Sequence, residues 1–340
     1  MHIGKNYTFK EVILWTRRDI FLLLVLATIP TLAYQMFGWH WMILPWLPIA
    51  LLGTAVAFVI GFKNNASSDR LWEARRIWGA ITNNSRSWGI MVKDYVTARH
   101  AKQTITDTEL HRIHLTLYKR HIAWLTALRY QLREPKNWES INLPHNREYR
   151  NTWFRVEEQD NSLQEAIKPY LSEEEFALVM TKTNKAAQIL ALQSKHLEQL
   201  LSQGLIEDFR HMELEKMIVE LINQQGASER IKGFPYPRQF ASLNTWFIKI
   251  FVTLLPFGML QEFAKFGEGL VWMTIPFSVL SGWIFTTMER IGETSENPFE
   301  GSANDVPITT IARNIEIDMM EMLHVDHQLK PVAVQNNILV

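Results

Sequence analysis

The longest stretch of the sequence without a charged side chain runs from Ile20 to Phe62. A helix needs about 20 apolar residues to cross a lipid bilayer, so this stretch has room for two crossings and a short turn. Gly38 marks the turn, and Trp39, Trp41 and Trp46 follow it, where aromatic side chains favour the membrane surface. A water-soluble helix pair would show a polar face, and none is present. The stretch therefore predicts two membrane-spanning helices.

A second apolar pair lies near the C-terminus. The residues from Gln239 to Leu260 are apolar apart from Lys249, and those from Leu270 to Met288 carry no charge. A lysine inside a span is costly unless it reaches the membrane surface, finds a partner or faces a polar cavity. A place near the membrane surface or in the protein interior explains Lys249 at least as well as a functional role. The pattern predicts two more spans.

Basic residues flank the first pair on both sides: Lys5, Lys10, Arg17 and Arg18 before it, and Lys63, Arg70, Arg75, Arg76 and Arg86 after it. Because excess Lys and Arg stay on the cytoplasmic side, both termini and the long middle are expected there. The first apolar run is too long for a cleavable signal peptide. The sequence thus predicts five parts: a cytosolic N-terminal segment (1–19), the first transmembrane pair (20–62), a cytosolic helical domain that continues the second span (63–238), the second pair (239–288) and a cytosolic C-terminal segment (289–340).

Helical spacing dominates the middle of the chain and the C-terminal segment. Apolar residues recur every three or four positions in the middle, and strand-like alternation is scarce. Ser172, followed by three glutamates, is a typical helix start. A further helical stripe, expected to dock onto the cytosolic bundle, is formed by Ile308, Ile311, Ile315, Met319 and Leu323. The fold class predicted is an all-α membrane protein.

Composition excludes several classes of function. The 35 basic and 35 acidic residues cancel, which argues against a nucleic-acid partner bound through bulk positive charge. The absence of cysteine excludes thiolate metal sites and cysteine nucleophiles. Two histidine pairs, His111 with His114 and His324 with His327, have helical spacing but lack a third ligand and a base, so surface histidines are favoured. No phosphate-binding loop is present. We expect no enzyme activity, no cofactor and no bound metal.

The second predicted span carries two stripes of period four. Gly53, Ala57 and Gly61 form a small-residue stripe that would let a neighbouring helix approach closely. One position on, Thr54, Phe58 and Phe62 form an adjacent stripe. In a monomer the two phenyl rings would meet lipid, which is the simpler interpretation. In a symmetric ring of subunits they would face the axis and form a narrow apolar throat that gates by wetting and dewetting.

Three motifs follow these stripes along the chain. The first is Gly61-Phe62-Lys63-Asn64, leading into Arg70-Leu71-Trp72-Glu73-Ala74-Arg75 and Trp78-Gly79. The second is Ser228-Glu229-Arg230-Ile231 with Pro235 and Pro237, and the third is Glu296-Asn297-Pro298-Phe299 with Asp305 and Pro307. Together with the four spans, this pattern resembles the bestrophin family, in its bacterial branch, over most of the chain.

The resemblance implies a homopentameric ion channel in the inner membrane of a bacterium, with the lipid bilayer, monovalent ions and further copies of the chain as its partners. It places a hydrophobic pore neck at Thr54, Phe58 and Phe62. Thr54 departs from the family's usual aliphatic residue, so the outermost ring is expected to be wetter. A second constriction is implied near Asp208 and Phe209, beside Glu207.

Animal members of the family open on calcium through an acidic cluster after Asn-Pro-Phe. Here that segment offers only Glu300 and Asp305, whereas calcium takes six to eight oxygen ligands. Calcium activation is therefore not expected.

The permeant ion is left open between two choices. Rings of Glu207 and Asp208 at an exit would favour cations, which points to sodium, with a chloride-selective channel of the same fold as the alternative. Two other classes compete with a channel. One is a membrane-anchored helical scaffold that conducts nothing, and the other is an intramembrane metal enzyme that uses the paired histidines.

Overall fold

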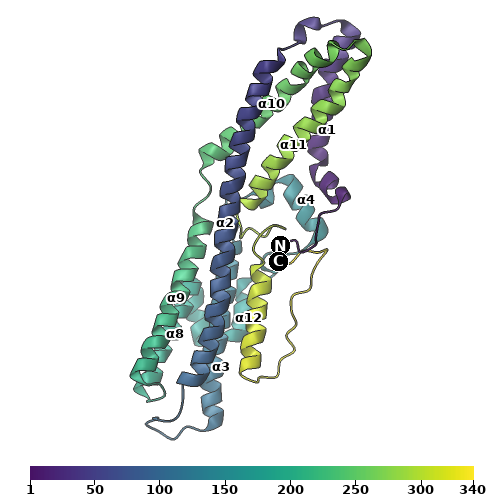
Figure 1. The fold of residues 1–340 in the computed structure, drawn as a ribbon. Helices are drawn as coiled ribbons and strands as arrows, with labels where there is room; N and C mark the ends of the chain where they lie inside the picture. The colour runs from purple at the N-terminus through teal and green to yellow at the C-terminus, as the bar shows by residue number, and fades with distance from the viewer.

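A computed structural model describes residues 1–340, apart from the side chain of Asn142. The described chain is helical throughout, and its only β pairing consists of isolated bridges. Four of its helices are long and apolar enough to cross a membrane, which confirms the predicted fold class. Figure 1 shows an elongated molecule with these four helices at one end, a second helical bundle at the other, and both chain termini together between them.

The membrane end consists of α1 (Phe9–Phe37), the first half of α2 (Trp46–Tyr95), α10 (Arg238–Ala264) and α11 (Thr274–Ser295). Short helices connect each pair: η1 (His40–Met42) and η4 (Glu268–Met273). Gly38 ends α1 with a φ of 65°, the left-handed conformation that glycine tolerates best, so the predicted turn is confirmed. Apolar side chains of α1, α2 and α10 form the core of this end, among them Leu23, Ile49 and Phe251.

The second bundle is built from the lower half of α2 together with α3 (Asp107–Arg133), α8 (Lys185–Ser202), α9 (Asp208–Gly233) and α12 (Ile308–Met322). Its core contains the fully buried rings of Trp78, Trp88, Tyr118 and Trp124. The stripe expected on α12 is confirmed, because Ile308, Ile315, Met319 and Leu323 are buried in this core and Ile311 packs against it.

Shorter helices cover the bundle: η2 (Ser140–Asn142), α4 (Pro144–Trp153), α5 (Glu157–Asp160), α6 (Leu163–Ile167), η3 (Lys168–Tyr170) and α7 (Glu173–Met180). The start of α7 confirms the expectation for Ser172. Its side chain accepts a hydrogen bond from the backbone of Glu175, and the Glu175 carboxylate accepts one from the backbone of Ser172 in return.

One expectation about histidine is wrong. His111 is exposed, but His114 is buried, and its Nε2 lies 2.8 Å from the carbonyl oxygen of Val96. The side chain helps to join the end of α2 to α3, a role that spacing along one helix does not indicate. Among the described residues, no group of three or more His, Cys, Asp or Glu side chains is placed to hold a metal ion.

Two helices cross the predicted domain boundaries without a break. The 50 residues of α2 span about 75 Å at 1.5 Å per residue and pass through the boundary at residues 62 and 63. Likewise, α11 continues past residue 288. The membrane end and the second bundle are therefore joined through the continuous helix α2, as Figure 1 shows, whereas residues 234–237 link α9 to α10 and residues 296–307 link α11 to α12.

Candidate pore-lining face and the joint beneath it

The predicted neck residues lie on an uncovered face of α2. Phe58 and Phe62 are 66% and 70% exposed, and Thr54 is exposed as well. They line an open groove of about 890 Å³ whose far side is formed by residues of α10 and α11, including Phe251 and Phe285. Eight residues separate the first neck position from the last, a rise of about 12 Å. Within one subunit, the three side chains thus share one apolar, unfilled surface.

The uncovered face continues down α2 into the second bundle. Its exposed positions alternate in steps of three and four: Phe58, Phe62, Asn65, Asp69, Trp72, Arg76, Gly79, Asn83, Arg86 and Ile90. This is the spacing by which one side of a helix faces a partner along its whole length. The face is apolar at the neck and largely polar below it.

The predicted packing stripe is only partly correct. A Cβ atom added to Gly53 would lie 2.8 Å from the Phe251 ring, so this glycine does allow α10 to approach. Ala57 is exposed, however, and nothing lies within 4 Å of a Cβ added to Gly61. Four residues turn a helix by about 400°, so each residue of a stripe with period four is rotated by about 40° relative to the one before it. Such a stripe soon leaves the face that contacts a neighbouring helix. The buried face instead follows Ile49, Gly53, Val56, Ile60, Lys63 and Ser67.

The hydroxyl of Thr54 bears on the expectation of a wetter outer ring. It donates a hydrogen bond of 3.0 Å to the Ala50 carbonyl of its own helix. That bond uses its only donor proton and leaves a methyl group and a hydroxyl lone pair on the surface. The surface that Thr54 presents is therefore less polar than that of a threonine whose hydroxyl is free to donate.

A buried ion pair sits directly below the neck. The Nζ of Lys63 lies 2.6 Å from Oε1 of Glu289 on α11, and both side chains are almost completely buried. The Glu289 carboxylate also accepts hydrogen bonds from the side chains of Asn244 and Thr245 on α10, the latter at 3.1 Å. Three helices thus meet on one carboxylate, and we call this cluster of Lys63, Glu289, Asn244 and Thr245 the joint. The joint fixes how α2 is rotated about its axis and which of its residues face outward.

The first motif continues this joint. The Asn64 amide donates to the Met288 carbonyl at 3.2 Å, and a Cβ added to the facing Gly292 would lie 2.1 Å from Asn64 Oδ1. Arg70 donates to the carbonyl of Glu296 at 2.9 Å and to that of Ile231 at 3.0 Å, so it joins α2 to the ends of α11 and α9.

The remaining motif residues pack around the same region. Arg230 pairs with Glu73, and Glu229 accepts hydrogen bonds from three amide side chains, those of Gln131, Asn184 and Gln225. Phe299 is buried, with its ring 6.5 Å from that of Trp78.

Other motif side chains play smaller parts. Asn297 is buried, and the Pro298 carbonyl accepts a hydrogen bond from the backbone of Val306. Trp72 is exposed, with the guanidinium of Arg75 5.3 Å from its ring, and Gly79 has open space around it. Most of the family motif therefore builds the joint rather than the pore surface.

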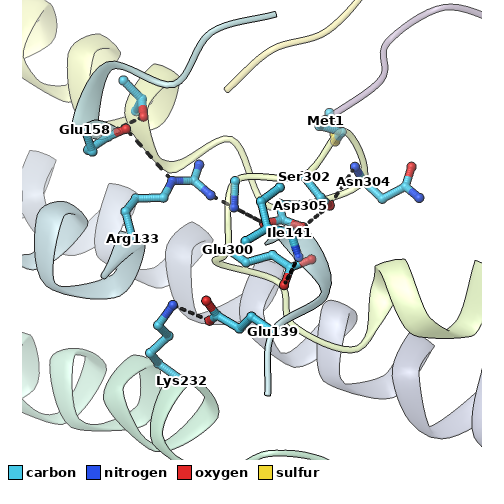
Figure 2. A network of polar contacts seen from close by, with 12 residues as sticks. Met1, Arg133, Glu139, Ile141, Glu158, Lys232, Glu300, Ser302, Asn304 and Asp305 are labelled. Carbon is cyan, nitrogen blue, oxygen red and sulfur yellow. Dashed lines mark hydrogen bonds and ion pairs between the residues drawn. The ribbon is translucent and has the colours of Figure 1, made fainter. Parts of the chain in front are cut away.

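Behind the joint lies a buried charged network, shown in Figure 2. Arg133 lies 3.4 Å from Asp305 and 4.0 Å from Glu158, and Lys232 pairs with Glu139. Glu300 accepts hydrogen bonds from the backbone and hydroxyl of Ser140 at 2.9 and 2.8 Å. Burial raises the pKa of Glu300 well above its usual range.

Glu300 and Asp305, the two carboxylates considered above as calcium ligands, both belong to this network. Burial raises the pKa of Asp305, while Arg133 acts against that rise. The backbone of Gly301 and the hydroxyl of Ser302 donate to Asp305 as well. Protein donors therefore already occupy both carboxylates, and the absence of calcium activation stays a prediction.

The residues expected to form a second constriction lie where α9 begins, at the end of the bundle far from the membrane helices (Figure 1). Phe209 is 85% exposed. Glu207 pairs with His100 at 3.1 Å and with Arg210 at 3.4 Å, whereas Asp208 is exposed. Within the subunit, Glu207 thus has one permanently charged partner, Arg210. Gly204, with a φ of 74°, turns the chain into α9 where a side chain would strike the His100 carbonyl.

Lys249 is exposed on α10, with its ammonium 5.2 Å from the centre of the Trp246 ring. This contact is a cation–π interaction on the outer surface of the subunit. The side chain is thus not buried in the interior of the subunit, one of the two places considered for it.

Sequence patterns missed the partners in the joint. Glu289 follows an uncharged span and would be noticed as the first acid after it, but its partner is 226 residues away in the chain. The pairing of Arg133 with Asp305 spans 172 residues. A single sequence carries no signal for such distant pairs beyond the scarcity of charges near a span.

Known proteins similar to this chain bear on these observations. A "Voltage-dependent anion channel-forming protein" of Escherichia coli K12 is 26% identical over 275 residues, which cover 81% of this chain and 76% of the relative. A protein of the same name from Ralstonia nicotianae is 26% identical over 278 residues, with the same coverage. The expectation that this chain is not an enzyme agrees with these names.

Solved structures share the fold. A crystal structure of a bacterial bestrophin homolog from Klebsiella pneumoniae matches with a TM-score of 0.75 at 22% identity, over 92% of this chain and 99% of that one. The family model described as "Bacterial/Fungal Bestrophin protein" matches residues 9–321. The match takes in all four membrane helices, the joint and most of the second bundle, so the chain belongs to the bacterial and fungal bestrophin family.

Proposed function

We propose that this chain is a subunit of a passive ion channel in which several copies, five by the family resemblance, surround one axial pore. The observation that carries the proposal is the uncovered face of α2. Its two phenyl rings are more than half exposed in one subunit, and the exposed stripe below them runs on for 28 residues from Phe62 to Ile90. Cyclic symmetry would give every subunit the same environment on this face.

The geometry of the neck suits such a ring. Residues four apart form a ridge inclined by about 26° to the helix axis. A tilt of α2 by about that angle would therefore align Thr54, Phe58 and Phe62 along the pore. Rings of phenyl groups would form an apolar constriction about 12 Å long that conducts when wetted and closes when dry.

We propose a monovalent anion such as chloride as the permeant ion. The preference for sodium depended on acidic rings at Glu207 and Asp208, and the first of these is paired with His100 and Arg210. The curated relatives are named anion channel-forming proteins. Both considerations favour the alternative that the sequence left open.

We place the channel in the bacterial inner membrane with both termini in the cytoplasm. The two termini lie side by side, since the backbone of Leu339 donates to the Met1 carbonyl at 2.9 Å. They are on the same side as the second bundle, which continues from α2 (Figure 1). The basic residues flanking the first pair put that side in the cytoplasm.

Reversal potentials of the purified protein in planar bilayers under a NaCl gradient test the proposal. A channel for anions is expected to reverse near the chloride equilibrium potential. Phe58→Ala with Phe62→Ala is expected to raise single-channel conductance several-fold by widening the neck. Phe21→Ala is the matched control, because Phe21 on α1 is equally exposed at 69%.

Three results would count against the proposal. Protein that passes no current in any bilayer would favour a scaffold. Current that both neck substitutions leave unchanged would place the pore elsewhere. A monomeric mass in native mass spectrometry would show that the subunits form no ring around an axial pore.

A further inference from the structure

A second cavity lies where the membrane end meets the joint, away from the neck. It has a volume of about 350 Å³, within the range of about 300–1,000 Å³ typical of small-molecule sites. Four segments enclose it: the start of α1, helix α4, the end of α11 and residues 302–304. Because α1 begins and α11 ends here, the cavity lies at the expected cytosolic surface of the membrane.

Most of the polar side chains in its wall are already satisfied. The Glu11 carboxylate caps α1 through the backbone and hydroxyl of Thr8, at 2.6 and 2.7 Å. The Tyr7 hydroxyl donates to Asn304 at 3.2 Å, and the Asn146 amide donates to the Ser140 carbonyl at 3.0 Å.

Three groups in the wall stand apart. The hydroxyl oxygens of Tyr149 and Thr287 are buried and make no hydrogen bond with the described residues. Arg150, next to Tyr149 on α4, is half-buried and has no acidic side chain of the described residues within 4.0 Å of its guanidinium. Burial lowers the pKa of Arg150, but arginine stays a cation because its ordinary pKa is far above neutral. Burial raises the pKa of Tyr149, so this hydroxyl stays a neutral donor.

The rest of the wall is apolar. Most of it comes from Val12 and Trp15 on α1, Ile291 on α11, Ile141 in η2, and Phe154 directly after α4. Water fills such a space poorly, because it needs two to four polar partners for each molecule. The Arg150 guanidinium is only half-buried, and the carboxylates of Asp160 and Glu300 act on it from beyond ion-pair distance, so it can still attract an anion in the cavity. The cavity therefore combines an apolar body with the Arg150 guanidinium and two neutral hydroxyl groups, while the one carboxylate in its wall, Glu11, is hydrogen-bonded to Thr8.

We propose that this cavity binds a small amphiphilic carboxylate, of the size and chemistry of a medium-chain fatty acid. The carboxylate pairs with Arg150 and accepts a hydrogen bond from Tyr149, while the alkyl chain lies between α1 and α11. A bound chain would hold α1, α4 and α11 together at the membrane surface. This site does not depend on the conduction proposed above.

Photolabelling of the intact protein in nanodiscs of zwitterionic lipid tests the site. The probe is decanoate carrying a diazirine on its alkyl chain. Labelling is expected to saturate, to be displaced by unlabelled decanoate, and to map by mass spectrometry to residues 7–15, 141–154 and 287–304. Labelling that does not saturate, or that maps elsewhere, would overturn the proposal without any variant.

Variants separate the charge from the apolar contact. A charged hydrogen bond contributes about 1.5–3 kcal/mol, so Arg150→Gln is expected to raise the decanoate concentration for half-saturation at least about tenfold. Tyr149→Phe is expected to raise it less. Arg147→Gln is the matched control, an exposed arginine on the same helix outside the cavity wall. Equal weakening by the two arginine variants would refute a role for Arg150.

Competitors identify the source of the ligand. Decanol, which lacks the carboxylate, is expected to compete far more weakly than decanoate. If decanol competes equally, the cavity is a non-specific apolar site and the proposal fails. If discs containing anionic phospholipid abolish labelling, the occupant is a bilayer lipid and the proposal also fails.

Discussion

Replacing Lys63 with methionine tests the central claim about the joint, that one buried ion pair fixes the rotation of α2. The substitution keeps an unbranched side chain, one atom shorter and without charge, but leaves Glu289 with two neutral partners, the Asn244 amide and the Thr245 hydroxyl. Removing one member of a buried pair costs about 3–5 kcal/mol, because the remaining charge stays buried. At about 2 °C per kcal/mol for a large domain, we expect Tm to fall by about 6–10 °C.

Thermal unfolding of the purified protein, followed by loss of its native elution peak, measures this effect. Lys249→Met is the matched control, since it removes the exposed lysine of a neighbouring span and one cation–π contact of about 0.5–1 kcal/mol. The double variant with Glu289→Met removes both charges and is expected to regain most of the loss. The reasoning fails if Lys63→Met and Lys249→Met have equal Tm, or if the double variant is less stable than Lys63→Met alone.

Three further predictions concern the joint, the buried charged network behind it and the polar part of the uncovered face of α2. Gly292→Ala is expected to lower the free energy of unfolding by about 1–3 kcal/mol because its Cβ would meet Asn64, whereas Gly61→Ala, with open space around it, is expected to be neutral in the same Tm measurement. Because the pKa of Glu300 is raised in the folded state, folded protein keeps a proton that unfolded protein releases above the ordinary pKa of 4.5, so the stability falls as the pH rises above that value. Glu300→Gln is expected to flatten the fall of Tm between about pH 5 and about pH 8. An unchanged slope of Tm against pH would contradict this. Arg76→Gln, at an exposed position of the α2 stripe, is expected to shift the reversal potential toward cation permeation at low salt and less so at 1 M salt, where charges are screened over about 3 Å; an equal shift at both would exclude an electrostatic role.

The membrane helices could be predicted from the sequence because their signal is local. A run of this length without charges, from Ile20 to Phe62, is long enough for two membrane-spanning helices. Gly38 marks the turn between them, and α1 does end at Gly38 in the structure. The stripe on α12 was equally accessible, since the period of a single helix reveals its buried face.

The contacts between distant segments could not be predicted. The stripe of Gly53, Ala57 and Gly61 shows why: small residues mark where a helix can approach, but only the geometry of α10 decides that Gly53 alone is used within the subunit. His114 is buried because the end of α2 folds back against α3, which no spacing within α3 encodes. The partner of Lys63 is hidden for the same reason.

The unbroken course of α2 limits how the neck can change its width. The helices α1 and α10 contain prolines in their interiors, Pro30 and Pro256, whereas the only proline of α2, Pro48, lies in its first turn. Proline is the usual cause of a sharp bend in a helix, so α1 and α10 have places to flex and α2 behaves as a stiff rod. In the proposed channel, Phe62 and Arg76 would then move together, and a stimulus that widened the neck would also shift the polar part of the uncovered face below it.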